Sequence, residues 1–138
     1  MGGAVTRVLI ADDQPRSRHS LQALLTAMRW SHQRRGGPGD GLIETVGEAS
    51  NGQEAISQIE LLHPDVVVMD LRMPKLDGTS AIRTIKGRWP EVRVVVLTMY
   101  ATDRAAALES GADAFLLKGC PTSELLDAVM PEQAGLPG

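Results

Sequence analysis

The chain has 138 residues, of which 43% are apolar, and a formal net charge of −3. A chain of this length typically forms one domain that buries about two-thirds of its unfolded surface. Its single cysteine excludes an internal disulfide framework, and no apolar run approaches the ~20 residues that cross a bilayer. The negative net charge gives no reason to expect direct nucleic-acid binding. The apolar start runs into Asp12 and Asp13 rather than into a cleavage site, so we expect a cytoplasmic protein.

Strands and helices alternate strictly in the pattern of apolar residues. Short runs rich in branched side chains predict strands, and apolar residues three or four positions apart predict helices. In chain order the pattern predicts strand 5–11, helix 16–28, strand 43–49, helix 52–62, strand 65–70, helix 79–86, strand 92–98, helix 102–110, strand 114–117 and helix 122–130.

This alternation predicts an α/β fold. The strands are almost wholly apolar, which requires cover on both faces and is typical of parallel sheets. We therefore expect a doubly wound, five-stranded parallel sheet with helices on both faces. Strand 43–49 carries Glu44 and Glu48 on one side, which favours a place at the edge.

We expect residues 1–131 to form one domain, and residues 132–138 have the composition of a linker or tail. Segment 29–41, "RWSHQRRGGPGDG", is longer than a turn between a helix and a strand needs. We expect it to be a flexible insertion on the edge of the sheet opposite the carboxyl ends of the strands.

Four of the predicted strands end on polar residues. They are Asp12 and Asp13 after the first strand, Asp70 after the third, Thr98 at the end of the fourth and Lys118 after the fifth. Ligands of open parallel sheets bind beyond these carboxyl ends, so we expect the five side chains to converge there.

Two interpretations of the strand-end residues remain open. Asp12 or Thr98 can simply cap the helix that follows. Three neighbouring carboxylates, in contrast, repel one another unless a cation is present, and Mg²⁺ favours such oxygen ligands together with a phosphate. With Mg²⁺ and Lys118 balancing the charge, Asp70 is suited to act as a nucleophile toward a phosphoryl group, and Thr98 to donate a hydrogen bond to it.

Four segments, "LIADDQP", "VVVMDLRMPKLDG", "VVVLTMY" and "GADAFLLKG", resemble the signature segments of the receiver domain of bacterial two-component response regulators. The residues of these segments are similar to those of the subfamily whose receivers precede a helix-turn-helix DNA-binding domain. The resemblance covers most of the chain except 29–41 and the tail. It implies the flavodoxin-like strand order 2-1-3-4-5.

The resemblance also implies a role for each site residue. Asp70 would accept a phosphoryl group from a sensor histidine kinase. Asp13, Asp70 and the backbone carbonyl of Arg72 would bind Mg²⁺ directly, with Asp12 acting through water. Thr98 and Lys118 would contact the phosphoryl group. Phe115 would be a switch aromatic that changes packing with Thr98, although a core position explains Phe115 equally well.

The resemblance further implies a phosphorylation-dependent switch in transcriptional regulation. The resemblance implies no enzyme activity other than catalysis of its own phosphorylation and dephosphorylation. Its partners would be the kinase, a C-terminal DNA-binding domain outside this chain and a second copy in a homodimer, with no membrane and no direct nucleic-acid contact.

Two alternatives differ in kind from this function. One is an atypical receiver that binds partners without phosphorylation. The other is a phosphohydrolase with an aspartate nucleophile, whose second aspartate would stand where this chain has Arg72.

Overall fold

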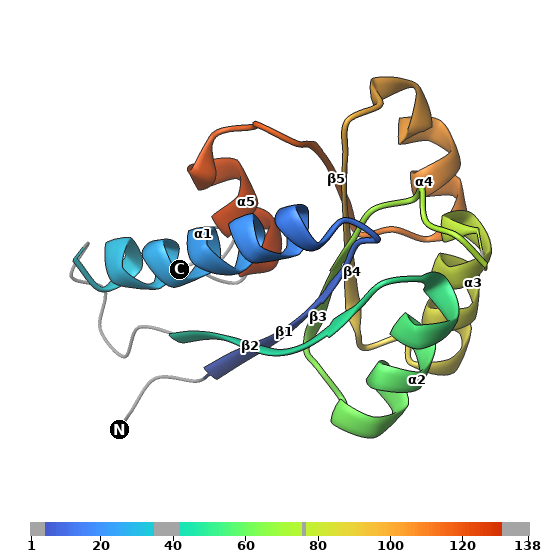
Figure 1. Ribbon diagram of the computed structural model, residues 1–138, viewed down its shortest axis with the longest axis horizontal. Helices are drawn as coiled ribbons and strands as arrows, with labels where there is room; N and C mark the ends of the chain where they lie inside the picture. The colour runs from blue at the N-terminus through green and yellow to red at the C-terminus, as the bar shows by residue number, and fades with distance from the viewer. Residues whose placement is uncertain (1–4, 35–41, 76, 131–138) are drawn as a thin grey trace, which may run out of the picture.

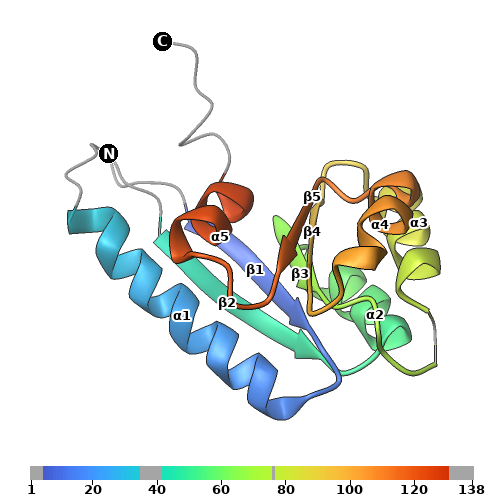
Figure 2. The same ribbon diagram turned by 90° about the horizontal axis from the view of Figure 1, so that it is seen from above.

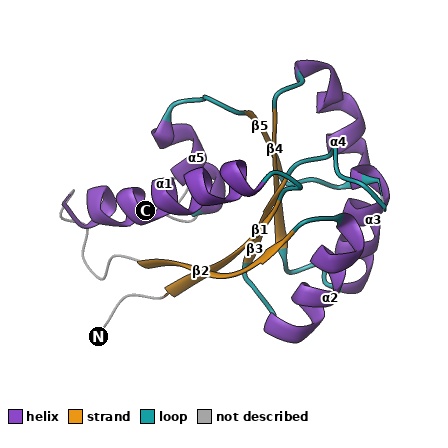
Figure 3. Cartoon of the chain, viewed as in Figure 1, coloured by secondary structure: helices purple, strands orange, loops and turns teal. Residues whose placement is uncertain are grey.

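The computed structural model of the protein describes residues 5–34, 42–75 and 77–130. Strands and helices alternate along the chain, and the sheet lies between two helical layers (Figure 3). The elements are β1 (Val5–Ala11), α1 (Pro15–Arg34), β2 (Leu42–Ala49), α2 (Gly52–Leu62), β3 (Val66–Met69), α3 (Gly78–Arg88), β4 (Arg93–Thr98), the 3₁₀ helix η1 (Ala101–Asp103), α4 (Arg104–Ser110), β5 (Ala114–Leu117) and α5 (Thr122–Val129).

All strand pairs are parallel, and the order across the sheet is β2-β1-β3-β4-β5. Helices α1 and α5 cover one face, and α2, α3 and α4 cover the other (Figure 1 and Figure 2). The predicted fold class, the strand order and the edge position of the second strand are therefore confirmed. Because the strands are parallel, their carboxyl ends lie at one edge of the sheet.

Alternate residues of the central strands enter two separate cores. In β1, Val8 and Ile10 belong to the apolar cluster under α1 and α5, whereas Leu9 and Ala11 belong to the cluster under α2, α3 and α4. All four are at most 1% exposed. Burial on both faces explains why these strands are continuous apolar runs rather than alternating ones.

The largest difference from the predicted elements is at the end of α1. The sequence pattern predicts that this helix ends at residue 28 and that 29–41 is a loop, but α1 continues to Arg34. The reason is local, because no glycine or proline interrupts the chain before Gly36. Residues 35–41 of the predicted insertion and the predicted tail 132–138 lie outside the described residues.

The other boundaries agree with the prediction to within a few residues. Strand β3 is shorter than predicted, so Asp70 lies just beyond its last residue, Met69. The predicted helix 102–110 is divided into η1 and α4. No helix in the described part of the chain is both long and apolar enough to cross a membrane.

Candidate functional site

The backbone places three of the predicted residues side by side at the carboxyl edge of the sheet. The hydrogen bonds of the sheet continue one residue past the strands. The N–H of Asp12 donates to Ala49 (2.9 Å), that of Asp70 to Ala11 (3.0 Å) and that of Lys118 to Thr98 (2.8 Å). The hydrogen bonds of the sheet therefore fix the backbone positions of Asp12, Asp70 and Lys118.

Lys118 lies between the two carboxylates. Its Nζ is 2.8 Å from Oδ2 of Asp12 and 2.9 Å from Oδ2 of Asp70, whose side chains are 8% and 10% exposed. Burial by itself lowers the pKa of Lys118, but the hydrogen bonds and charges of Asp12 and Asp70 outweigh it and raise that pKa above its ordinary value. Lys118 is thus protonated at neutral pH and balances a pair of carboxylates that would otherwise repel each other.

The second oxygen of each carboxylate accepts a backbone hydrogen bond. Oδ1 of Asp12 accepts from the N–H of Gln14 (2.9 Å), and Oδ1 of Asp70 accepts from the N–H of Arg72 (3.0 Å). These two-residue turns hold each side chain in one orientation. Asp12 therefore orders the turn before α1 and also belongs to the charged cluster.

Thr98 and Phe115 occupy different surroundings. Thr98 is fully buried, and its Oγ1 accepts a 3.4 Å hydrogen bond from the N–H of Tyr100. Phe115 lies opposite Val96 in the β4–β5 ladder, is half-buried and packs against the core under α2, α3 and α4. This position is compatible with a core role and with a switch role, so the assignment of Phe115 as a switch residue stays a prediction.

The predicted metal ligands are only partly brought together. Asp13 follows Asp12 and is half-exposed. Within residues 5–34, 42–75 and 77–130, no group of three or more His, Cys, Asp or Glu side chains is arranged to hold a metal ion. The predicted Mg²⁺ site has only two carboxylates, Asp13 and Asp70, as direct ligands, together with the carbonyl of Arg72. It therefore remains a prediction.

The side chain of Arg72 has contacts that the sequence did not predict. Its Nε and Nη2 donate to the carboxylate of Asp103 at 3.2 and 3.1 Å. Its guanidinium also lies 3.9 Å from the ring centre of Tyr100. Because Arg72 and Asp103 are 31 positions apart, no local pattern could reveal the pair.

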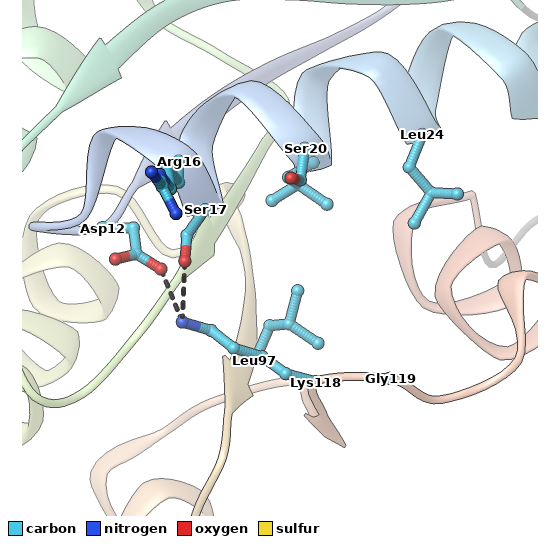
Figure 4. Close-up of a pocket in the computed structure, with 9 residues that line it drawn as sticks. Asp12, Arg16, Ser17, Ser20, Leu24, Leu97, Lys118 and Gly119 are labelled. Atoms are coloured by element: carbon cyan, nitrogen blue, oxygen red, sulfur yellow. Dashed lines mark hydrogen bonds and ion pairs between the residues drawn. The ribbon is translucent and has the colours of Figure 1, made fainter.

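A cavity of about 280 Å³ opens beside the charged cluster, between α1 and the ends of β4 and β5 (Figure 4). Figure 4 shows Lys118 reaching Asp12 and Ser17, whose Oγ is 3.4 Å from Nζ. Leu24 lines the cavity farther along α1, and Leu97 of β4 lines it beside Lys118. Lys118 thus lies at the wall of this open cavity.

Comparison with known proteins agrees with this geometry. The family model described as "Response regulator receiver domain" matches residues 8–130. The response regulator protein VraR of Staphylococcus epidermidis is 40% identical over 95 residues, which are 67% of this chain and 46% of that protein. The chain thus spans about half the length of the curated relatives that it matches.

Two solved structures share the fold. A two-component response regulator of the LuxR family from an Aurantimonas species has a TM-score of 0.76 at 30% identity, covering 96% of this chain and 87% of that one. The signal receiver domain of the putative response regulator NarL from Mycobacterium tuberculosis has a TM-score of 0.77 at 28% identity, covering 96% and 98%. The chain belongs to the family of response regulator receiver domains of two-component systems.

Proposed function

We propose that this receiver is a phosphorylation-dependent signalling switch in which Asp70 accepts a phosphoryl group from a sensor histidine kinase. The observation that carries the proposal is the pairing of Asp70 with Lys118. A buried carboxylate is held by one backbone N–H and lies 2.9 Å from an ammonium. This arrangement presents a fixed nucleophile beside a positive charge that can accept phosphoryl oxygens.

The bonds formed and broken in the transfer balance between Asp70 and the kinase. A carboxylate oxygen of Asp70 forms a bond to phosphorus as the phosphorus–nitrogen bond to the kinase histidine breaks, and the electron pair of that bond stays on the histidine. Lys118 then balances negative charge on the phosphoryl oxygens. Thr98, at the end of β4, donates a hydrogen bond from its hydroxyl to one of them.

Mg²⁺ is the proposed cofactor, and the donors fit its chemistry. Mg²⁺ takes oxygen ligands, keeps several waters and is commonly held by one or two carboxylates together with a phosphate. Asp13, Asp70 and the carbonyl of Arg72 would hold it, with Asp12 acting through water. When bound, it would neutralise charge on the transferred group.

A receiver domain is a signalling domain and not a classical enzyme. We propose that its only catalysis is its own phosphorylation and dephosphorylation. The match covers less than half of the length of the curated relatives, so we further propose a cytoplasmic regulator with a C-terminal DNA-binding domain that controls transcription, and a homodimer as the active form. A similar solved structure, 25% identical with a TM-score of 0.68, is a DNA-binding response regulator of the LuxR family from Staphylococcus aureus, which supports this assignment.

Intact-protein mass spectrometry tests the proposal. We expect the wild-type protein, incubated with Mg²⁺ and acetyl phosphate, to gain the mass of a single phosphoryl group. Asp70→Asn should gain none, because an amide is not a nucleophile toward phosphorus under these conditions. Glu60→Gln, which alters an exposed ion pair with Arg88, should behave like the wild type.

Two outcomes would contradict the proposal. A folded wild-type protein that gains no mass at any Mg²⁺ concentration would leave the atypical, phosphorylation-independent receiver as the better interpretation. A gain that persists in Asp70→Asn would place the acceptor elsewhere.

A further inference from the structure

The side chain of Arg72 is held from two sides by the segment that joins β4 to α4. Asp103 accepts two hydrogen bonds from its guanidinium, at 3.1 and 3.2 Å. The ring of Tyr100 stacks on the same guanidinium at 3.9 Å. A planar, two-point pair between arginine and a carboxylate fixes direction as well as distance. The guanidinium of Arg72 therefore has one defined position although its side chain is 53% exposed.

The backbone of Arg72 belongs to the acceptor site. Its N–H donates to Oδ1 of Asp70 at 3.0 Å, and its carbonyl is the proposed third protein ligand of Mg²⁺. A change in the direction of the Arg72 side chain would thus be transmitted to one hydrogen bond of the acceptor and to one metal ligand.

A free guanidinium at this position would also compete with a cation. Arg72 is close enough to Asp70 that the negative charge of Asp70 contributes to raising the pKa of Arg72, after the larger contribution of the hydrogen bond with Asp103. Without Asp103, Asp70 is the carboxylate that still attracts the guanidinium. An arginine drawn there would occupy the region where the carboxylates are proposed to bind Mg²⁺.

We propose that Asp103 is a positioning residue for the acceptor site. It acts through Arg72, keeping the guanidinium away from the carboxylates and holding the Arg72 backbone in place, and Tyr100 supports it by stacking. This inference rests on the proposed function, because it concerns the affinity of the same site for Mg²⁺. By linkage, bound Mg²⁺ should in turn stabilise the observed position of the β4–α4 segment.

The chain offers a matched control for this arrangement. Arg88 also stacks on an aromatic ring, that of Trp89 at 4.5 Å, and pairs with a carboxylate, that of Glu60 at 3.6 Å. Arg88 is the last residue of α3, which runs from the acceptor edge of the sheet back to the opposite edge. Removing the carboxylate of Glu60 therefore removes the same kind of contact far from Asp70.

The test measures Mg²⁺ binding to the unphosphorylated protein by calorimetry. We expect Asp103→Asn to bind Mg²⁺ about threefold to fivefold more weakly, a modest effect because the pair is partly exposed. Asp103→Glu should recover part of the loss, and Glu60→Gln should bind like the wild type. On an Arg72→Ala background, Asp103→Asn should cause no further loss, because the residue through which it acts is gone.

A second measurement needs no metal. In hydrogen exchange followed by NMR, the amide of Arg72 should exchange several times faster in Asp103→Asn than in the wild type or in Glu60→Gln, because its hydrogen bond to Asp70 is held less firmly. A purely long-range charge effect would not change this amide.

Three results would overturn the inference. Wild-type affinity in Asp103→Asn would show that Arg72 needs no positioning. An equal loss on the Arg72→Ala background would show that only the charge of Asp103 matters. Absence of Mg²⁺ binding by the wild-type protein would overturn the proposed cofactor as well, whereas the first two results leave the phosphorylation of Asp70 intact.

Discussion

Lys118 shows how one side chain can make a pair of buried carboxylates compatible with folding. Counted over the whole residue, Asp12 is 5% and Asp70 8% exposed. Two buried negative charges side by side are unfavourable without a compensating cation. Lys118 supplies that charge from the opposite part of the sequence, 106 positions after Asp12. Because its pKa is raised, the compensation is fully present at neutral pH and is lost only as the pH rises through its folded value.

Asp77 gives a prediction at the same scale. Its side chain caps α3 by accepting hydrogen bonds from the N–H and Oγ1 of Thr79 (3.0 and 2.8 Å) and from Oγ of Ser80 (2.9 Å). The hydrogen bonds of Thr79 and then of Ser80 lower the pKa of Asp77 below its ordinary 3.8. We expect Asp77→Ala to lower the free energy of unfolding by about 1 kcal/mol at pH 7.

The sign of the pH dependence follows from linkage. A lowered folded-state pKa stabilises the protein above the unfolded-state value, and this stabilisation is lost as the pH falls through the folded-state value. In urea denaturation between pH 6 and pH 3, the difference between wild type and Asp77→Ala should therefore shrink toward low pH. Asp77→Asn, which keeps a capping oxygen, should stay close to the wild type at pH 7. A difference that is constant with pH would contradict the prediction.

At the scale of elements, α3 begins in close contact with the acceptor loop. A Cβ on Gly78 would lie 2.5 Å from Cα of Leu71 and 2.7 Å from its carbonyl oxygen, and both are backbone atoms that cannot give way cheaply. Leu71 directly follows Asp70, so the start of α3 supports the loop that carries the acceptor. Gly87, near the other end of the same helix, has nothing within 4 Å of such a Cβ.

The two glycines of α3 should therefore respond to the same substitution in opposite directions. We expect Gly78→Ala to lower the free energy of unfolding by about 1 to 3 kcal/mol, because the loop after β3 must shift. Gly87→Ala should raise it by roughly 0.5 to 1 kcal/mol, because alanine is the better helix former. Chemical denaturation of both variants checks this, and a Gly78→Ala protein as stable as wild type would contradict the close approach.

At the scale of the whole molecule, the site joins the most buried strand to an edge strand. Every residue of β3, which carries Asp70 at its end, is buried, whereas β5, which carries Lys118, is half-buried and ends on the 40% exposed Leu117. The acceptor is thus anchored in the centre of the sheet, and its cationic partner stands on the part with the fewest neighbours. Strands at the edge open more easily than strands in the core.

This difference predicts the pattern of native-state hydrogen exchange. After correction for intrinsic rates, the amides of β3 should be among the slowest to exchange and those of β5 should exchange at least tenfold faster, because β5 opens without global unfolding. NMR-detected exchange near neutral pH checks this. Equal protection of the two strands would show that β5 unfolds only together with the core.

Much of the fold could be predicted from local sequence patterns. The bounds of β1, α2 and β5 agree exactly with the prediction. The two strands are short apolar runs and α2 has helical periodicity, and all three are bounded by turn or charged residues. The end of α1 was predicted wrongly, because the glycine-rich composition of 36–41 was extended to a stretch that lacks helix breakers. The order of the strands came from the resemblance to receivers, since periodicity does not specify which strands are neighbours.

The sequence by itself determined which side chains end the strands, and hence that Asp12, Asp70, Thr98 and Lys118 share one edge of the sheet. Only the tertiary structure decided the contacts of the site: Lys118 bridges both carboxylates, Phe115 packs against the core under α2, α3 and α4, and Arg72 turns to Asp103 and Tyr100. The physical reason is one of range. Secondary structure follows from contacts between residues a few positions apart, whereas these pairs join residues 28 to 106 positions apart, which meet only after the crossover helices have packed.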